Sequence, residues 1–167
     1  IYPLNRNRHR DGILRLTRAP WDAPSLQRNA ASYLRRVLEH FRYVGVLNVE
    51  FFVRGGRLYA NETAPRVHNS GHWTIEGAAT SQFENHLRAI LGLPLGSTAA
   101  RAQVAMINLI GTMPARDTVL GMPEAHWHDY GKKPRPGRKL GHITLLASTA
   151  TKRDSLARKL LREIDPA

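Results

Sequence analysis

Two apolar segments joined by a pair of glycines constrain the fold of this chain most strongly. Residues 44–53 are rich in β-branched and aromatic side chains, and residues 58–62 follow after Gly55 and Gly56. Such a pattern is typical of a β-hairpin. The sequence therefore predicts an antiparallel pair of strands in the middle of the chain.

The two arms of this hairpin each carry a carboxylate, Glu50 and Glu62. A turn of Gly55 and Gly56 alone, with regular pairing, would put them on opposite faces. A three-residue loop that includes Arg57, or a bulge, would put them opposite each other. Facing carboxylates repel unless a cation lies between them, and Mg²⁺ prefers one or two carboxylates plus phosphates and water. The alternative is that Glu50 faces solvent.

A dense polar run follows the second arm: Arg66, His68, Asn69, Ser70 and His72 fall within seven residues. An arginine fork, imidazoles, an amide and a hydroxyl could together hold and polarise a small oxyanion. A zinc site is less favoured, because zinc would need a third protein ligand beside the two imidazoles. The other alternative is a hydrogen-bonded structural loop.

A second polar cluster is the basic turn at residues 132–139, which has five cationic side chains in eight residues and two prolines that stiffen it. Flanking strands would hold it in place, so it could bind a phosphate or a carboxylate. A solvated charged turn is equally compatible with these residues.

Composition excludes several classes of protein. The chain has 167 residues, 42% of them hydrophobic and 23% charged, and no cysteine, which excludes disulfides and thiolate metal sites. No apolar run approaches the roughly 18 residues of a membrane span, and a cytoplasmic enzyme is expected. The net charge is +12, with 20 Arg and 5 Lys. Because the aromatic residues do not alternate with the basic ones, a nucleic-acid surface is disfavoured.

The remaining patterns predict an α+β fold, with an antiparallel sheet, flanking helices and a small β-rich appendage after a boundary at residues 96–101. Helical spacing of apolar residues predicts an amphipathic helix at 25–41 whose apolar stripe belongs to the core. Two further helices are expected to be capped by Ser81 and Thr151. The predicted strands lie at 13–17 (paired with the N-terminal residues through a turn at 7–12), 103–110, 127–130 and 141–146.

In this order, the clusters resemble the N5-carboxyaminoimidazole ribonucleotide synthases, a family of ATP-dependent ligases in the ATP-grasp superfamily. The most specific match is NETAPRVHNSGHWT at 61–74, and further matching segments lie at 2–14, 44–53, 81–96, 106–111 and 133–143. The family has an N-terminal α/β domain, an ATP-grasp centre and a small C-terminal β-rich domain. The resemblance implies that residues 1–98 are the second half of the ATP-grasp domain and 99–167 the C-terminal domain.

The resemblance also implies a role for each cluster. Bicarbonate would be phosphorylated by ATP to carboxyphosphate, and the carboxyl group would pass to the amino group of aminoimidazole ribonucleotide in purine biosynthesis. The implied cofactors are ATP and Mg²⁺, and a homodimer is implied. The implied site residues are Glu50 and Glu62 for the metal, His9, Asn61 and Glu62 for the nucleotide, Arg66, His68 and Asn69 for bicarbonate and carboxyphosphate, and Ser70, Lys132, Arg135, Arg138 and Lys139 for the ribonucleotide.

Three alternatives remain open on the sequence alone. One is another ATP-grasp carboxylate–amine ligase or a biotin carboxylase-like module, which would share the paired carboxylates. The second is a basic nucleic-acid-binding domain, which would bind arbitrary duplex with a steep salt dependence and hydrolyse no ATP. The third is a polypeptide that folds but is inert.

Because the chain opens at Ile1 and matches only the later part of the family, we expect a processed or truncated piece that needs the N-terminal part of the same protein. These 167 residues alone should show little or no ATP hydrolysis that depends on aminoimidazole ribonucleotide. A coupled assay of ADP release measures this, and robust turnover would refute the expectation.

Overall fold

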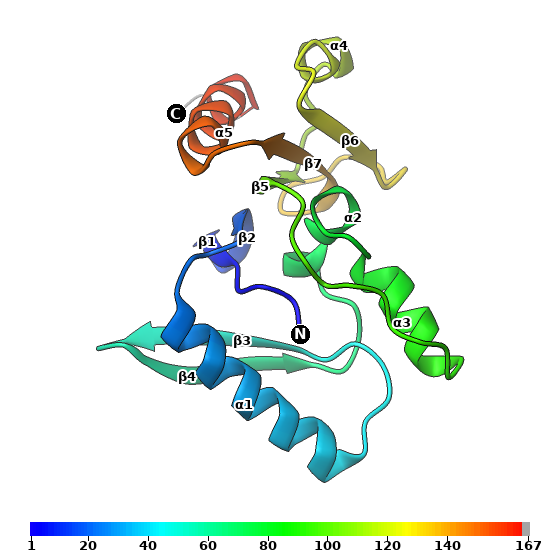
Figure 1. Ribbon diagram of the computed structural model, residues 1–167. Helices are drawn as coiled ribbons and strands as arrows, with labels where there is room; N and C mark the ends of the chain where they lie inside the picture. The colour runs from blue at the N-terminus through cyan, green and yellow to red at the C-terminus, as the bar shows by residue number, and fades with distance from the viewer. Residues whose placement is uncertain (165–167) are drawn as a thin grey trace.

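The computed structural model describes residues 1–164, so the end of the predicted C-terminal domain, 165–167, lies outside the described residues. Its main feature is a five-stranded antiparallel sheet in the order β1-β2-β5-β7-β6 (Figure 1). This architecture confirms the predicted mixture of helices and antiparallel strands. The strands are β1 (Arg6–Arg10), β2 (Ile13–Ala19), β5 (Gln103–Ile110), β6 (Ala125–Asp129) and β7 (Lys139–Ala147).

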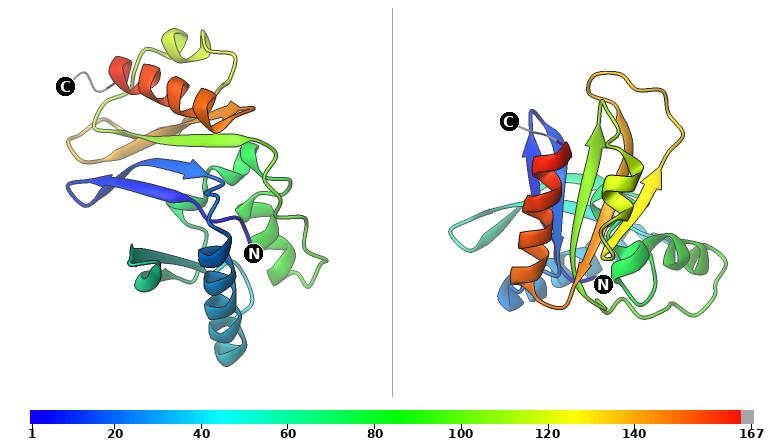
Figure 2. Two further views of the ribbon diagram at one scale, coloured as in Figure 1. Left: turned by 60° about the vertical axis from the view of Figure 1, so that its left-hand side comes forward. Right: turned by 90° about the horizontal axis from the view of Figure 1, so that it is seen from above.

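Helices cover both faces of this sheet (Figure 2). The closing helix α5 (Ala150–Ile164) packs on one face, where its Ala157 and Leu160 meet Ile107, Ile143 and Leu145 of the strands. The short helix α2 (Thr74–Gly77) and the preceding Trp73 lie against the other face, in a second buried cluster with Val104 and Met106. The sheet is therefore the middle layer between two apolar clusters.

A β-bulge in β2 allows this one strand to contribute side chains to both apolar clusters. Arg8 pairs with Leu16, whereas the next residue, His9, pairs with Leu14, so Arg15 is an extra residue. Such a bulge breaks the strict alternation of side chains. Leu14 and Leu16 consequently enter the two clusters on opposite faces, although two residues apart in a regular strand share a face.

The predicted boundary between residues 98 and 99 stays a prediction. In the sheet, β2 pairs with β5, so strands from both sides of that boundary form one continuous ladder. The residues just before β5 also return to the earlier part of the chain, since Ala79 N–H donates to Ala99 O at 2.8 Å and Arg101 N–H donates to Gly77 O at 2.7 Å.

The hairpin of β3 (Asn48–Arg54) and β4 (Arg57–Ala64) is a separate two-stranded sheet beside α1 (Pro24–Phe41), as Figure 1 shows. The apolar stripe of α1 is core only in part, because its residues Leu26, Leu34, Val37 and Leu38 are partly buried. Ala30 is its buried residue, whereas Tyr33 and Phe41 are 43% and 71% exposed. A two-stranded ribbon offers too little surface to cover a helix of 18 residues.

Of the two predicted helix caps, one is confirmed and the other is wrong. Ser81 caps α3 (Gln82–Ile90), because its Oγ accepts the Glu84 N–H at 3.1 Å as predicted. For α5 the cap is Thr149, whose Oγ1 accepts the Lys152 N–H at 3.1 Å, and not Thr151. The remaining helical segments are η1 (Asn69–Gly71) and α4 (Arg116–Leu120), and in the described residues no helix is long and apolar enough to cross a membrane.

Replacing Leu145 by Ala should lower the free energy of unfolding by about 3 kcal/mol, because it leaves a cavity in the cluster under α5. Leu145 is fully buried, whereas Leu120 at the end of α4 is 48% exposed and provides the matched control. Urea unfolding of both variants measures the difference. Equal losses for Leu145→Ala and Leu120→Ala would contradict this account of the core.

Candidate active site

The two hairpin carboxylates face each other. Gly55 and Gly56, both at positive φ, form a two-residue turn that pairs Arg54 with Arg57. Of the two arrangements that would bring the carboxylates together, the bulge is therefore the one present, and the three-residue loop is not formed. Phe51 pairs with Ala60, and Glu50 pairs with Glu62. Asn61 is therefore the extra residue that returns Glu62 to the position opposite Glu50.

Glu50 also contacts the large sheet. Asn7 of β1 donates from Nδ2 to Glu50 Oε1 at 3.5 Å, and the buried Thr17 of β2 donates its hydroxyl to Asn7 Oδ1 at 2.9 Å. Because a carboxylate can only accept, the amide nitrogen of Asn7 faces Glu50, and the oxygen of Asn7 is left to accept the Thr17 hydroxyl. The five-stranded sheet thus helps to orient a side chain of the separate hairpin.

The polar run begins at His68, whose proton location follows from its contacts. The backbone N–H of Ser70 donates to His68 Nδ1 at 3.3 Å, and Ser70 Oγ lies 2.8 Å from the same nitrogen. Nδ1 is then an acceptor, so the neutral ring carries its proton on Nε2 and can donate it to an anion. Ser70 is only 2% exposed and also accepts from Asn48 Nδ2 at 3.4 Å.

A buried amide clamps the backbone at His68. Gln82, the first residue of α3, accepts the His68 N–H at 2.9 Å and donates to the His68 carbonyl at 2.8 Å. Gly71 leaves room for this side chain, since a Cβ there would overlap Gln82 Oε1. The loop is therefore held by a buried side chain rather than by solvent.

The next residue, Asn69, brings the loop to the C-terminal strands. Its Oδ1 accepts from Lys139 Nζ at 3.4 Å, and its amide also pairs with Asn108 of β5. Burial lowers the pKa of Lys139, and the negative charges of Glu50 and Glu62 oppose that effect. Residues predicted from three separate clusters thus lie within electrostatic reach of one another.

The same two carboxylates act on His68, whose pKa is lowered by burial and raised in part by their charges, while Arg66 and Lys139 lower it further. Arg66 is exposed, and its guanidinium donates to Val67 O at 3.1 Å. Carboxylates beside an imidazole, a guanidinium and an ammonium form a site in which a metal–phosphate complex and a small oxyanion could lie side by side.

The donor set fits magnesium better than a transition metal. The site offers the two carboxylates of Glu50 and Glu62 at paired β positions. Within residues 1–164, no group of three or more His, Cys, Asp or Glu side chains could hold a metal ion. A hard cation that keeps water and phosphate ligands needs no such cage.

The basic turn lies between β6 and β7, with Lys139 as the first residue of β7, and only part of the turn reaches the site. Lys132 lies over the Tyr130 ring at 5.4 Å and acts electrostatically on Lys139. Arg138 folds back to donate to Lys133 O at 3.3 Å, and Arg135 is exposed. Lys139 is thus the one predicted ribonucleotide contact of this turn with a hydrogen bond to the polar loop in the described residues.

The remaining predicted residues lie on the strands. His9 is exposed on β1 beside the β2 bulge, and Asn61 is the exposed bulge residue of β4. His72, the last member of the polar run, turns away from the carboxylates. Its Nδ1 lies 3.0 Å from the His68 carbonyl, and its ring lies 5.2 Å from that of His142 on β7.

His72 belongs to a seam of aromatic and acidic groups that the sequence analysis missed. His128 and His142 stack with ring centroids 4.1 Å apart, Tyr130 Oη lies 2.8 Å from His142 Nδ1, and His128 Nε2 lies 2.6 Å from Glu76 Oε1. Asn69, His72 and Glu76 recur at helical spacing and all meet the C-terminal strands, a signal that could have been read from the sequence.

Comparison with known proteins identifies the family. A profile described as the ATP-grasp domain matches residues 1–83, and one described as the phosphoribosylaminoimidazole carboxylase C-terminal domain matches residues 104–155. The N5-carboxyaminoimidazole ribonucleotide synthase of Pseudomonas aeruginosa is 57% identical over 87% of this chain and 40% of its own length. That of Escherichia coli is 45% identical over 99% of this chain and 47% of its own length.

This chain belongs to the N5-carboxyaminoimidazole ribonucleotide synthase family of the ATP-grasp superfamily. The synthetase structure from Thermus thermophilus superposes with a TM-score of 0.96 at 57% identity, over 98% of this chain and 46% of that one. The Aspergillus clavatus synthase in complex with ADP and 5-aminoimidazole ribonucleotide gives a TM-score of 0.90 at 37% identity, over 99% of this chain and 47% of that one. The chain thus spans somewhat under half the length of these relatives, and its fold is that of their ATP-grasp and C-terminal parts.

The histidine seam should make stability depend on pH. Burial lowers the pKa of His72 to about 4 and that of His142 to about 3, from an ordinary value of 6.5. At a pH between 6.5 and these lowered pKa values, the unfolded chain binds more protons than the folded one. Stability therefore falls as the pH falls below 6.5. The midpoint of urea unfolding should decrease between pH 6.5 and about pH 5, before carboxylates protonate.

His142→Phe should flatten this decrease, because the variant removes one of the histidine rings whose pKa burial lowers. His40→Gln, at the exposed end of α1, provides the control and should keep the wild-type slope. Unfolding series at several pH values compare the slopes. A wild-type slope in His142→Phe would contradict the assignment.

Proposed function

We propose that the complete protein containing these residues is an ATP-dependent ligase that carboxylates 5-aminoimidazole ribonucleotide to N5-carboxyaminoimidazole ribonucleotide in purine biosynthesis. The observation that carries the proposal is the pairing of Glu50 with Glu62 within electrostatic reach of His68 and Lys139. Family membership supports the same reaction. The Aspergillus clavatus synthase is known in complex with ATP and, in a second structure, with ADP and 5-aminoimidazole ribonucleotide, the nucleotide and the acceptor that this chemistry requires.

In the proposed first step, a bicarbonate oxygen attacks the γ-phosphorus of ATP, the bond to the β-phosphate oxygen breaks, and carboxyphosphate and ADP form. Glu50 and Glu62 would hold Mg²⁺, which when bound neutralises phosphate charge. The Arg66 guanidinium, the Nε2–H of His68 and the amide of Asn69 would hold bicarbonate and then carboxyphosphate. Preorganised donors of this kind act where negative charge accumulates.

In the proposed second step, the carboxyl group leaves phosphate as CO₂ and forms a bond to the 5-amino nitrogen, which loses a proton. Lys132, Arg135, Arg138 and Lys139 would bind the phosphate or carboxylate of the ribonucleotide, a recognition suited to ammonium and guanidinium groups. Ser70, whose hydroxyl is buried against His68, would contribute by orienting that ring rather than by touching the ribonucleotide.

The nucleotide pocket of the proposal includes His9, Asn61 and Glu62, which lie on β1 and β4. The exposed Tyr33 and Phe41 of α1 are compatible with a surface that another part of the protein covers. The proposal includes the N-terminal part of the same protein and, from family membership alone, a homodimer and a cytoplasmic location. Size-exclusion chromatography with light scattering on the complete protein tests the dimer.

Glu62→Gln in the complete enzyme should lower kcat by at least about 100-fold, because an amide is a poorer ligand for a hard cation than a carboxylate. Folding should be intact, since Glu62 is exposed. The measurement is ADP release that depends on both bicarbonate and aminoimidazole ribonucleotide.

Glu39→Gln on the exposed side of α1 is the matched control, which changes the same charge away from the hairpin and should leave kcat unchanged. A near-normal rate for Glu62→Gln would remove this residue from the metal site. A complete wild-type protein that released no ADP under these conditions would overturn the proposed function itself.

A further inference from the structure

A buried amide in the C-terminal sheet reaches the candidate site. Asn108 is flanked by apolar residues of strand β5, and it is 3% exposed. An amide at such a position is costly unless its hydrogen bonds are made. Its Nδ2 donates to Leu14 O at 2.8 Å and to Asn69 Oδ1 at 2.6 Å, and its Oδ1 accepts from Asn69 Nδ2 at 3.0 Å.

These contacts determine which way both amides point. A backbone carbonyl can only accept, so Leu14 O requires the nitrogen of Asn108 on its side. The second hydrogen of that nitrogen then requires the oxygen of Asn69, and the reverse orientation would bring two like groups together. Lys139 agrees with this arrangement, because its ammonium, which can only donate, approaches the same Asn69 oxygen at 3.4 Å.

We infer that Asn108 is a positioning residue for the carboxylation reaction, an inference that rests on the proposed function. By holding the Asn69 oxygen toward β5, it leaves the second N–H of Asn69 for the oxyanion and provides an acceptor that steadies the Lys139 ammonium. Asn108 touches no substrate itself. It acts from the strand through the amide of Asn69.

The test uses the complete enzyme and the variant Asn108→Leu, which keeps the size of the side chain and removes its hydrogen bonds. With the Asn69 amide free to turn, kcat/KM for bicarbonate should fall roughly 10- to 100-fold, the scale on which small misplacements of reacting groups act. Asn108→Asp is the second variant, should Asn108→Leu fail to fold. It keeps the shape but replaces the donor by an oxygen, and the same loss is expected.

A double-mutant cycle separates positioning from general damage. If Asn108 acts through Asn69, the variant with both Asn69→Ala and Asn108→Leu should be no slower than Asn69→Ala alone, within about twofold. Losses that multiply would overturn the inference. So would a folded Asn108→Leu enzyme with wild-type kcat/KM.

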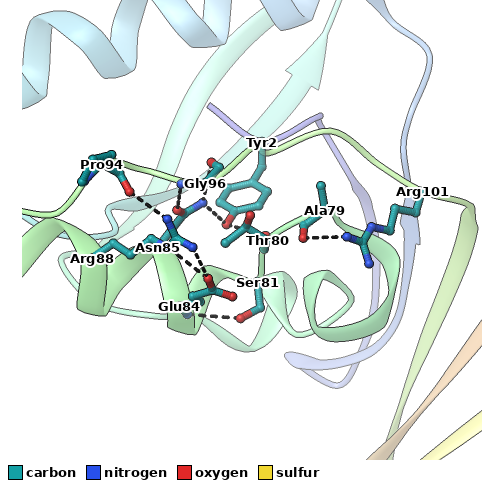
Figure 3. Close-up of polar contacts among 10 residues, drawn as sticks. All are labelled: Tyr2, Ala79, Thr80, Ser81, Glu84, Asn85, Arg88, Pro94, Gly96 and Arg101. Carbon is teal, nitrogen blue, oxygen red and sulfur yellow. Dashed lines mark hydrogen bonds and ion pairs between the residues drawn. The ribbon is translucent and has the colours of Figure 1, made fainter.

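Asn85 supplies a matched control for the loss of a buried amide (Figure 3). It is 4% exposed, and it donates to Tyr2 Oη at 2.8 Å and Gly96 O at 3.2 Å and accepts from Gly96 N at 2.8 Å. Asn85→Leu should lower the melting temperature but leave kcat/KM for bicarbonate within about twofold of wild type. An equal kinetic loss in Asn85→Leu would overturn the assignment of Asn108.

The wild-type enzyme distinguishes failure of the proposed function from failure of the role of Asn108. A complete wild-type protein without ADP release dependent on bicarbonate and aminoimidazole ribonucleotide overturns the proposed function and the inference with it. Normal release in the wild type together with normal kinetics in folded Asn108→Leu or Asn108→Asp overturns the inference alone.

Discussion

The pairing of β2 with β5 is the constraint on which the rest of the structure depends. It joins the first strands of the chain to the C-terminal strands in one ladder, with Leu16 opposite Ile107. Two residues before Leu16, the carbonyl of Leu14 accepts a hydrogen bond from Asn108 of β5. Strand β7 pairs with the other edge of β5. The ammonium of Lys139 reaches the polar loop for this reason, although 70 residues separate it from Asn69. Without this pairing, nothing in the sheet would hold Lys139 of the basic turn close to Asn69 of the loop.

Electrostatics explain why the carboxylates and the cations of the site tolerate one another. Glu50 and Glu62 are at paired positions, where like charges destabilise a hairpin. Their charges also raise the pKa values of His68 and Lys139, against the lowering caused by burial. The cationic form of Lys139 is therefore favoured by the same carboxylates that would bind magnesium. Mutual compensation of this kind is stronger in a partly dehydrated site than in water.

The sequence predicts local features well here and misses those that depend on distant contacts. Gly55 and Gly56 identified the hairpin, and the Ser81 motif identified the start of α3. The bulge at Asn61 was only an alternative, because an extra residue in a strand leaves no reliable mark on the hydrophobic pattern. Most candidate site residues could be named from the sequence because they cluster in the chain, and their roles stay predictions. Asn108 was missed because its role depends on a hydrogen bond to Asn69, which lies 39 residues earlier in the chain.

The histidine seam also helps to hold the polar loop against the C-terminal strands. His72 and His142 are neutral in the fold, since burial lowers both pKa values well below the ordinary 6.5. Neutral rings can stack between the loop and the sheet without adding positive charge next to Lys139, whose charge already lowers the pKa of His72. Protonated rings would repel one another and that lysine. The neutral rings of His72 and His142 therefore join the loop to β7 through a ring contact, and they leave the cationic charge at the site to Arg66 and the basic turn.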